Sequence, residues 1–236
     1  RKELVSVSRK NHIVTFLAGA FLFGHFFCWF NAVKLTNIGS AVVLAALHPL
    51  VVIILTVFVF KRKVSVRQIL GIALLGGTMV AGFDYRELSQ GNFIGDILAF
   101  MAAIFMGLYF AIGNEVRKEV SGRVYVFLVF LACWLCFAIG IIATKTPVLG
   151  YSLKDYALIL GLTLVCQIGA HAVFNLCFGY VDSLYVSAWE SGESVFAIIL
   201  SIIFLGQFPT QWEIMGCAVV VAGLLYYNYF SSKQGK

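Results

Sequence analysis

Charged and amide side chains lie near the middle of several long hydrophobic stretches of this sequence, where such residues are rare. Glu190 and Glu193 share one stretch, and His25 and His48 lie in two others. An isolated carboxylate in lipid costs several kcal/mol or stays protonated, so ionisable residues at this depth tend to bind a ligand or carry a proton. We therefore expect a polar site inside the membrane. Its candidate residues are His25, Trp29, His48, Gln167, His171, Asn175, Glu190 and Glu193.

Spacing and depth relate these residues to one another. Gln167, His171 and Asn175 follow at intervals of four residues, which places them on one face of a helix. Three polar residues in register favour a water-lined cavity over simple contact between helices. At 1.5 Å per residue, His48 and Glu193 each lie about 14–15 Å along their helices, near the membrane midplane. For His25 and His48 a packing role, in which the imidazole binds a carbonyl of a neighbouring helix, is equally open.

Eight hydrophobic segments supply the helices that would carry this site. Each is long enough to cross a hydrocarbon core of about 30 Å, which takes about 17–25 residues of helix. In lipid only helices and closed barrels satisfy every backbone group, and runs this long are not barrel strands. The sequence therefore predicts an all-α membrane protein, a polytopic helical bundle of eight transmembrane helices. The segments are Ile13–Val33, Ile38–Phe60, Val66–Phe83, Gly95–Gly113, Val124–Thr144, Tyr156–Tyr180, Leu184–Leu205 and Trp212–Phe230.

The composition agrees with a protein embedded in lipid. Hydrophobic residues make up 61% of the chain and charged residues 12%, whereas soluble proteins have roughly half and a quarter. The net charge of +6 is interpreted as the positive-inside bias of a membrane protein, and no nucleic-acid partner is predicted. The six cysteines fall within hydrophobic segments, and Cys133 and Cys136 have no His or carboxylate nearby in sequence. No metal or cofactor is predicted.

Lysine and arginine residues set the predicted orientation. Thirteen of the 17 lysine and arginine residues occur in four places: the N-terminal stretch, the loop between the second and third segments, the loop between the fourth and fifth segments, and the C-terminus. All four places are expected on one side of the membrane. Positively charged loops stay in the cytoplasm. Both ends of this chain are therefore expected to be cytoplasmic, in a multi-pass protein of the plasma (inner) membrane.

A shift of 145 residues places the first part of the sequence on the second. Ile53–Leu55 then matches Ile198–Leu200, and the match runs without a gap across three helices and their loops. Repeats of this kind are typical of transporter folds. The unmatched helices indicate a unit of five, so that successive units enter the membrane from opposite sides. We expect residues 1–90 to be a partial first repeat and residues 91–236 a complete second one, the remainder of a ten-helix inverted repeat (5+5) lacking its first two helices.

The run Trp29–Pro49 (WFNAVKLTNIGSAVVLAALHP) resembles the third and fourth helices of EamA-type transporters, in the drug/metabolite transporter (DMT) superfamily. Gln68–Gly71 and Glu213–Gly216 are similar to that family's polar-x-x-Gly start of its fifth and tenth helices, and Gly95-Asp96 to the start of its sixth. The resemblance covers residues 13–230. It implies ten helices in two inverted repeats, and transport of small organic metabolites.

We interpret the chain as a secondary-active transporter, an exporter of small organic metabolites that works by alternating access, with protons as the candidate coupling ion. Its partners are then a small-molecule substrate and the lipid bilayer. The alternatives are an intramembrane enzyme and a non-transporting membrane scaffold. An enzyme is not favoured, because the aspartates lie at segment ends and no Gly-x-Ser-Gly or His-Glu-x-x-His sequence occurs. A scaffold would need partner-binding loops, and the loops are short.

Overall fold

Helices make up all the secondary structure that the computed structural model describes. The described residues are 7–36, 38–66, 68–73, 93–190, 192–205 and 211–231, and no strand occurs among them. Long runs of Leu, Ile, Phe and Ala form helices because a helix satisfies its backbone polar groups within the segment, which lipid requires. The prediction of an all-helical membrane protein is confirmed.

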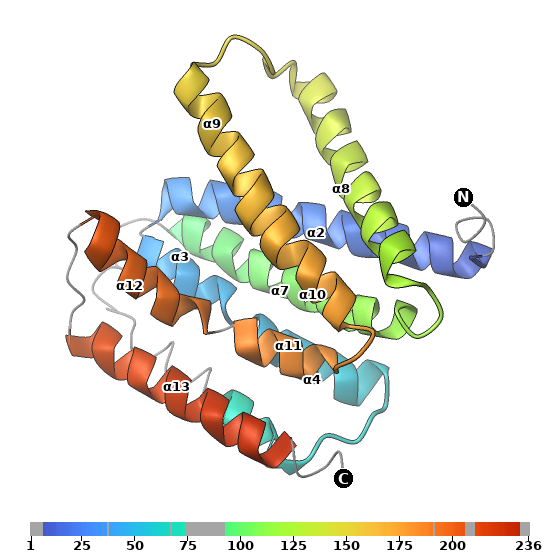
Figure 1. Ribbon diagram of the computed structural model, residues 1–236, viewed down its shortest axis with the longest axis vertical. Coiled ribbons are helices and arrows are strands. Elements are labelled where there is room, and N and C mark those ends of the chain that lie inside the picture. Colours follow the sequence, from blue (N-terminus) through green and yellow to red (C-terminus); the bar gives the residue numbers. More distant parts are fainter. Residues whose placement is uncertain are drawn as a thin grey trace. The chain divides into compact units, whose positions relative to one another are not determined.

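Four helical stretches are long and apolar enough to cross a membrane (Figure 1). They are α2 (Arg9–Leu35), α7 (Phe93–Val116), α8 (Gly122–Thr144) and the run Leu153–Cys177. That run consists of α9 (Leu153–Leu162), the π-helix η2 (Thr163–His171) and α10 (Ala172–Cys177). Each stretch coincides with a predicted segment. The number of eight crossings stays a prediction.

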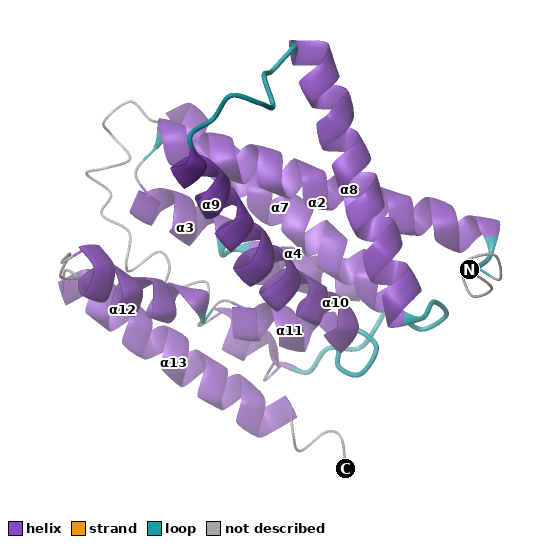
Figure 2. Cartoon of the chain, turned by 45° about the horizontal axis from the view of Figure 1, so that its top comes forward, coloured by secondary structure: helices purple, strands orange, loops and turns teal. Residues whose placement is uncertain are grey.

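Two predicted segments are each divided into separate helices, which the hydrophobic pattern did not indicate. The first contains α3 (Ile38–Ala45), α4 (His48–Ile54) and the π-helix η1 (Leu55–Val59). The second contains α11 (Ser183–Glu190) and α12 (Glu193–Leu205), which Figure 2 shows as distinct helices.

Proline and glycine account for the two divisions. Pro49 has no backbone N–H, and its ring collides with the carbonyl four residues earlier, that of Ala45. The helix that precedes it therefore ends at Ala45. Gly192 follows the end of α11 and has weak helix propensity, because glycine loses the most backbone freedom on folding.

The last predicted segment coincides with α13 (Gln211–Ser231). Of the predicted segment Val66–Phe83, residues 68–73 are helical. Residues 74–83 lie outside the described residues.

By internal packing the chain divides into two compact units, and each draws on both halves of the sequence. Unit 1 consists of Arg1–Phe23 and Ile112–Val186, and unit 2 consists of Gly24–Ala111 and Ser187–Lys236.

In unit 1, α10 packs against α8, while α8 and α9 separate toward the loop that joins them (Figure 1). The first part of α2 also lies close to α8. A Cβ on Gly19 would lie 2.5 Å from the Val129 carbonyl oxygen and 2.6 Å from the Ala132 Cβ. Only glycine permits this approach, which is a common mode of helix association in lipid.

Unit 2 packs around the small side chains of α7. Ala99, Ala102 and Ala103 are fully buried there, and Gly107 lies against Val51 of α4. Small residues let helix backbones approach closely, so van der Waals contact replaces the hydrophobic effect that lipid removes. The result is a dense centre from which α4 cannot shift without disturbing α7.

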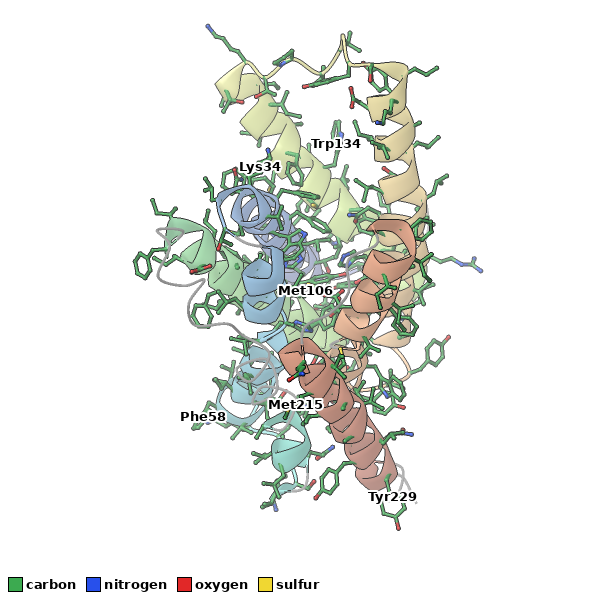
Figure 3. All side chains as sticks on the ribbon, turned by 90° about the vertical axis from the view of Figure 1, so that its left-hand side faces the viewer. Lys34, Phe58, Met106, Trp134, Met215 and Tyr229 are labelled. Atoms are coloured by element: carbon green, nitrogen blue, oxygen red, sulfur yellow. The ribbon has the colours of Figure 1, made fainter. Side chains whose placement is uncertain are left out.

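Large apolar side chains cover the outside of unit 2. Phe58 is 75% exposed and Tyr229 is 55% exposed, whereas Met106 is 2% exposed. Figure 3 shows Phe58 and Tyr229 pointing outward and Met106 lying inside. An apolar exterior of this kind marks an interaction surface in a soluble protein, and in a membrane protein it is the surface that lipid chains cover.

Candidate functional site

A buried ion pair lies in unit 2, between two of the predicted site residues. His48 Nε2 is 3.0 Å from Glu190 Oε2, and the two side chains are 5% and 8% exposed. The ring of Phe110 stands edge-on to His48, with the ring centres 5.7 Å apart. A charged pair removed from water is stable only when the charges meet directly, because each isolated ion would lose its hydration.

The contacts of His48 indicate that the pair holds one exchangeable proton. His48 Nδ1 lies 3.3 Å from the Ala45 carbonyl oxygen. A carbonyl oxygen can only accept, so Nδ1 carries a hydrogen in this contact. The contact with Glu190 then needs one more proton, donated either by Nε2 to a carboxylate or by a protonated carboxyl to Nε2. The chemistry available to the pair is therefore the uptake and release of that proton.

Both residues of the pair lie at helix breaks. His48 is the first residue of α4 and Glu190 the last of α11. Transporters build their binding sites from such discontinuous helices, because irregular backbone at membrane depth needs a cavity or protein partners. Glu193, the first residue of α12, is exposed. It is close enough to His48 and Glu190 to interact with both electrostatically.

His25 and Trp29 lie in the same unit but make packing contacts. His25 Nδ1 is 3.0 Å from the Ala102 carbonyl oxygen of α7, so the imidazole bridges two helices as in the packing interpretation. Trp29 packs against a hydrophobic cluster that includes the buried residues Ala32 and Ala99.

The remaining predicted residues belong to unit 1. Gln167 and His171 lie in the π-helix η2 and are half-buried, while Asn175 of α10 is fully buried. A π-helix bonds from residue i to residue i+5, a variation that is frequent at functional sites. It also changes the spacing that predicted the polar face, since α-helical geometry does not hold through η2.

Sequence reasoning missed Arg117, which it counted only as a positive charge. Arg117 Nε donates to the backbone oxygen of Asn175 at 3.1 Å, and its Nη1 donates to the Val120 oxygen. The guanidinium thus fastens the turn after α7 to α10. Nearby, Asn114 Nδ2 donates to Asp182 Oδ2 at 3.3 Å. No side-chain pattern reveals such partners, because two of them are backbone carbonyls.

The structure therefore brings His48 and Glu190 together, with Glu193 nearby, and places His25 and Trp29 in packed positions. A single cavity shared by all eight predicted residues stays a prediction. In the part of the chain that the structure describes, no group of three or more His, Cys, Asp or Glu side chains could hold a metal ion.

Several long apolar helices are the mark of a polytopic membrane protein. The sequence matches the EamA-like transporter family over residues 1–81 and 93–229, and the chain belongs to that family. The resemblance inferred from the sequence is thereby confirmed. The protein is an integral membrane transporter of the DMT type, a class that has small-molecule substrates and is embedded in membrane lipid.

Solved structures share the fold. One crystal structure, described simply as that of a protein, superposes with a TM-score of 0.77 at 16% identity. The alignment covers 99% of this chain and 80% of the other. At this identity the likeness shows the fold alone. None of the curated proteins matches the chain.

Proposed function

We propose that the protein is a secondary-active exporter of small organic metabolites, working by alternating access and coupled to protons at the His48–Glu190 pair. The observation that carries this proposal is the buried 3.0 Å contact between His48 and Glu190, which joins the ends of two broken helices. Ionisable residues at this depth in a membrane bundle belong to ion or proton pathways more often than to packing.

The bounds of the broken helices support the internal repeat on which the alternating-access proposal rests. A shift of 145 residues carries α3, Ile38–Ala45, onto α11, Ser183–Glu190, at both ends. The same shift carries the start of α4 at His48 onto the start of α12 at Glu193. The two copies thus break at equivalent positions, although proline is present at one break and glycine at the other. In inverted-repeat transporters such breaks lie near the midplane, at the interface of the repeats.

Glu193 completes the proton route. The pair itself is buried, whereas Glu193 is exposed and lies within electrostatic range of both partners. Glu190 interacts electrostatically with both His48 and Glu193. Glu193 thus offers a second carboxylate through which a proton can reach and leave the pair. The chain lies in the plasma membrane with both ends in the cytoplasm, as its positive loops indicate.

Transport into and out of vesicles tests the proposal. The full-length protein is reconstituted with a pH-sensitive dye inside, and a panel of metabolites is presented as outward gradients. Metabolite movement by the wild-type protein should change the internal pH. Glu190→Gln and Glu193→Gln should abolish the proton movement, because an amide cannot exchange a proton. Glu115→Gln is the matched control, since this carboxylate pairs with Lys118 at a partly exposed position outside the site.

Two results separate the parts of the proposal. Full transport by Glu190→Gln that does not depend on pH would refute proton coupling at the pair. Failure of the wild-type protein to move any metabolite of the panel would refute the exporter function.

A further inference from the structure

The two helix breaks are flanked by four residues, of which three are ionisable. Ala45 and His48 flank the first break, and Glu190 and Glu193 flank the second. Under the shift of 145 residues, Ala45 is equivalent to Glu190, and His48 is equivalent to Glu193. The observed contact therefore joins the residue after the first break to the residue before the second.

Symmetry defines the counterpart of this contact. In an inverted-repeat transporter the two access states are related by an exchange of roles between the repeats, since one repeat rocks against the other around a fixed site. A contact between the repeats in one state is replaced in the other state by the contact between the equivalent residues. For His48–Glu190 the counterpart is Glu193–Ala45.

The counterpart cannot be an ion pair, because the methyl group of Ala45 carries no charge and no polar hydrogen. The structure agrees with this asymmetry, because the contact that it shows is the charged His48–Glu190 pair, which is buried and closed. A strong interaction that exists in only one of two states shifts the population toward that state by its own free energy.

We propose that the His48–Glu190 pair is a state-selective lock, which holds the transporter in the access state recorded here and has no equivalent in the opposite state. This inference rests on the repeat and the alternating access of the proposed function. It adds the state that the pair favours: most molecules of the resting protein are in the access state that contains the pair. Breaking the pair permits the change to the opposite access state.

A matched set of variants tests the lock. His48→Ala and Glu190→Ala each remove it, and the double variant should do no more than either alone, because each single change already abolishes the contact. In Ala45→His combined with His48→Ala, the imidazole is moved to the other flank of the break. By the same repeat equivalence, the imidazole is then placed to pair with Glu193 in the opposite state. Glu115→Ala is the control, because it removes a carboxylate remote from the breaks.

Spin-label distances measure the populations without knowledge of the substrate. The six native cysteines are replaced, and labels are attached to exposed positions on each predicted face of the full chain in lipid nanodiscs. One doubly labelled protein carries Lys61→Cys and Arg123→Cys, and the other carries Lys34→Cys and Lys145→Cys.

The expected result is one dominant distance population in the wild-type protein and in the control. Each single variant should raise the ratio of the second population to the first at least about tenfold, the effect expected for a hydrogen bond between charged groups. The relocated imidazole should make the second population dominant. If the relocated variant does not fold, equal shifts in both single variants and no further shift in the double variant carry the same conclusion.

Distance distributions that stay unchanged in both single variants would overturn the lock, as would opposite shifts in His48→Ala and Glu190→Ala. The proposed function is judged separately, by the vesicle assay. A protein whose labels exchange as expected but which moves no metabolite would refute the exporter function and leave the lock standing.

Discussion

Substitution of Gly107 by alanine should break the His48–Glu190 contact, although Gly107 does not belong to the pair. A Cβ at Gly107 of α7 would lie 2.5 Å from the Val51 Cβ, 2.7 Å from its Cγ1 and 3.1 Å from the His48 carbonyl oxygen. Carbon atoms pack best at about 3.5–4.0 Å, so Gly107→Ala must displace α4 by about 1 Å. Overpacking of this kind costs about 1–3 kcal/mol.

The displacement acts on the ion pair because His48 belongs to the helix that has to move. Its contact with Glu190 is 3.0 Å, and a shift of about 1 Å away from Glu190 takes it beyond the distance of a hydrogen bond. We therefore expect Gly107→Ala to lose both stability and proton movement. For a protein of this length the loss lowers the Tm by about 2–4 °C for each kcal/mol.

Thermal unfolding in detergent and the pH-dye vesicle assay measure the two effects on the same preparation. The control is Gly140→Ala, since nothing lies within 4 Å of a Cβ at Gly140. This control should keep its Tm or gain slightly, because alanine favours helix over glycine by about 0.8–1.0 kcal/mol. The reasoning is refuted if Gly107→Ala matches Gly140→Ala in both Tm and proton movement.

Two further expectations concern polar contacts that hold helices together, and both are measured by thermal unfolding. Arg117→Ala should lower the free energy of unfolding by about 1–3 kcal/mol, because Arg117 donates to the backbone oxygens of Asn175 and Val120. Arg117→Lys should recover part of the loss. A Tm of Arg117→Ala equal to that of the wild type would contradict this role. Thr36→Val should lower the free energy of unfolding by about 1–3 kcal/mol, since the Thr36 hydroxyl donates at 2.7 Å to Asp96, which is 6% exposed. Thr36→Ser keeps the hydroxyl and should keep the wild-type Tm. A lowered Tm in Thr36→Ser would show that the methyl group matters instead.

The sequence contains most of the information about the membrane helices and the family. Long apolar segments predict helices because lipid allows few alternatives, and the segments that became α2, α7 and α8 were located to within a few residues. The breaks within two segments were not predicted. Pro49 offered a signal for the first break, whereas Gly192 alone did not distinguish a break from close helix packing.

The identity of the ion-pair partner could not be predicted in the same way. The sequence places His48 and Glu193 at similar depths near the midplane, yet the contact of His48 is with Glu190. The choice depends on which end of each broken helix faces the other, a feature of tertiary packing that local sequence does not record. The contact of His25 with the Ala102 carbonyl shows the same limit, because a backbone acceptor carries no sequence signature.

The single proton of the His48–Glu190 pair has an electrical consequence. With the proton on either partner the pair is neutral as a whole, as an imidazolium facing a carboxylate or as an imidazole facing a carboxyl. Transfer within the 3.0 Å contact therefore displaces little charge along the membrane normal, and the membrane potential has little effect on it. Departure of the proton leaves one net negative charge, on which the potential acts with about 2.3 kcal/mol per 100 mV for a full crossing. The voltage sensitivity of the transporter should accordingly reside in the loading and unloading of this proton.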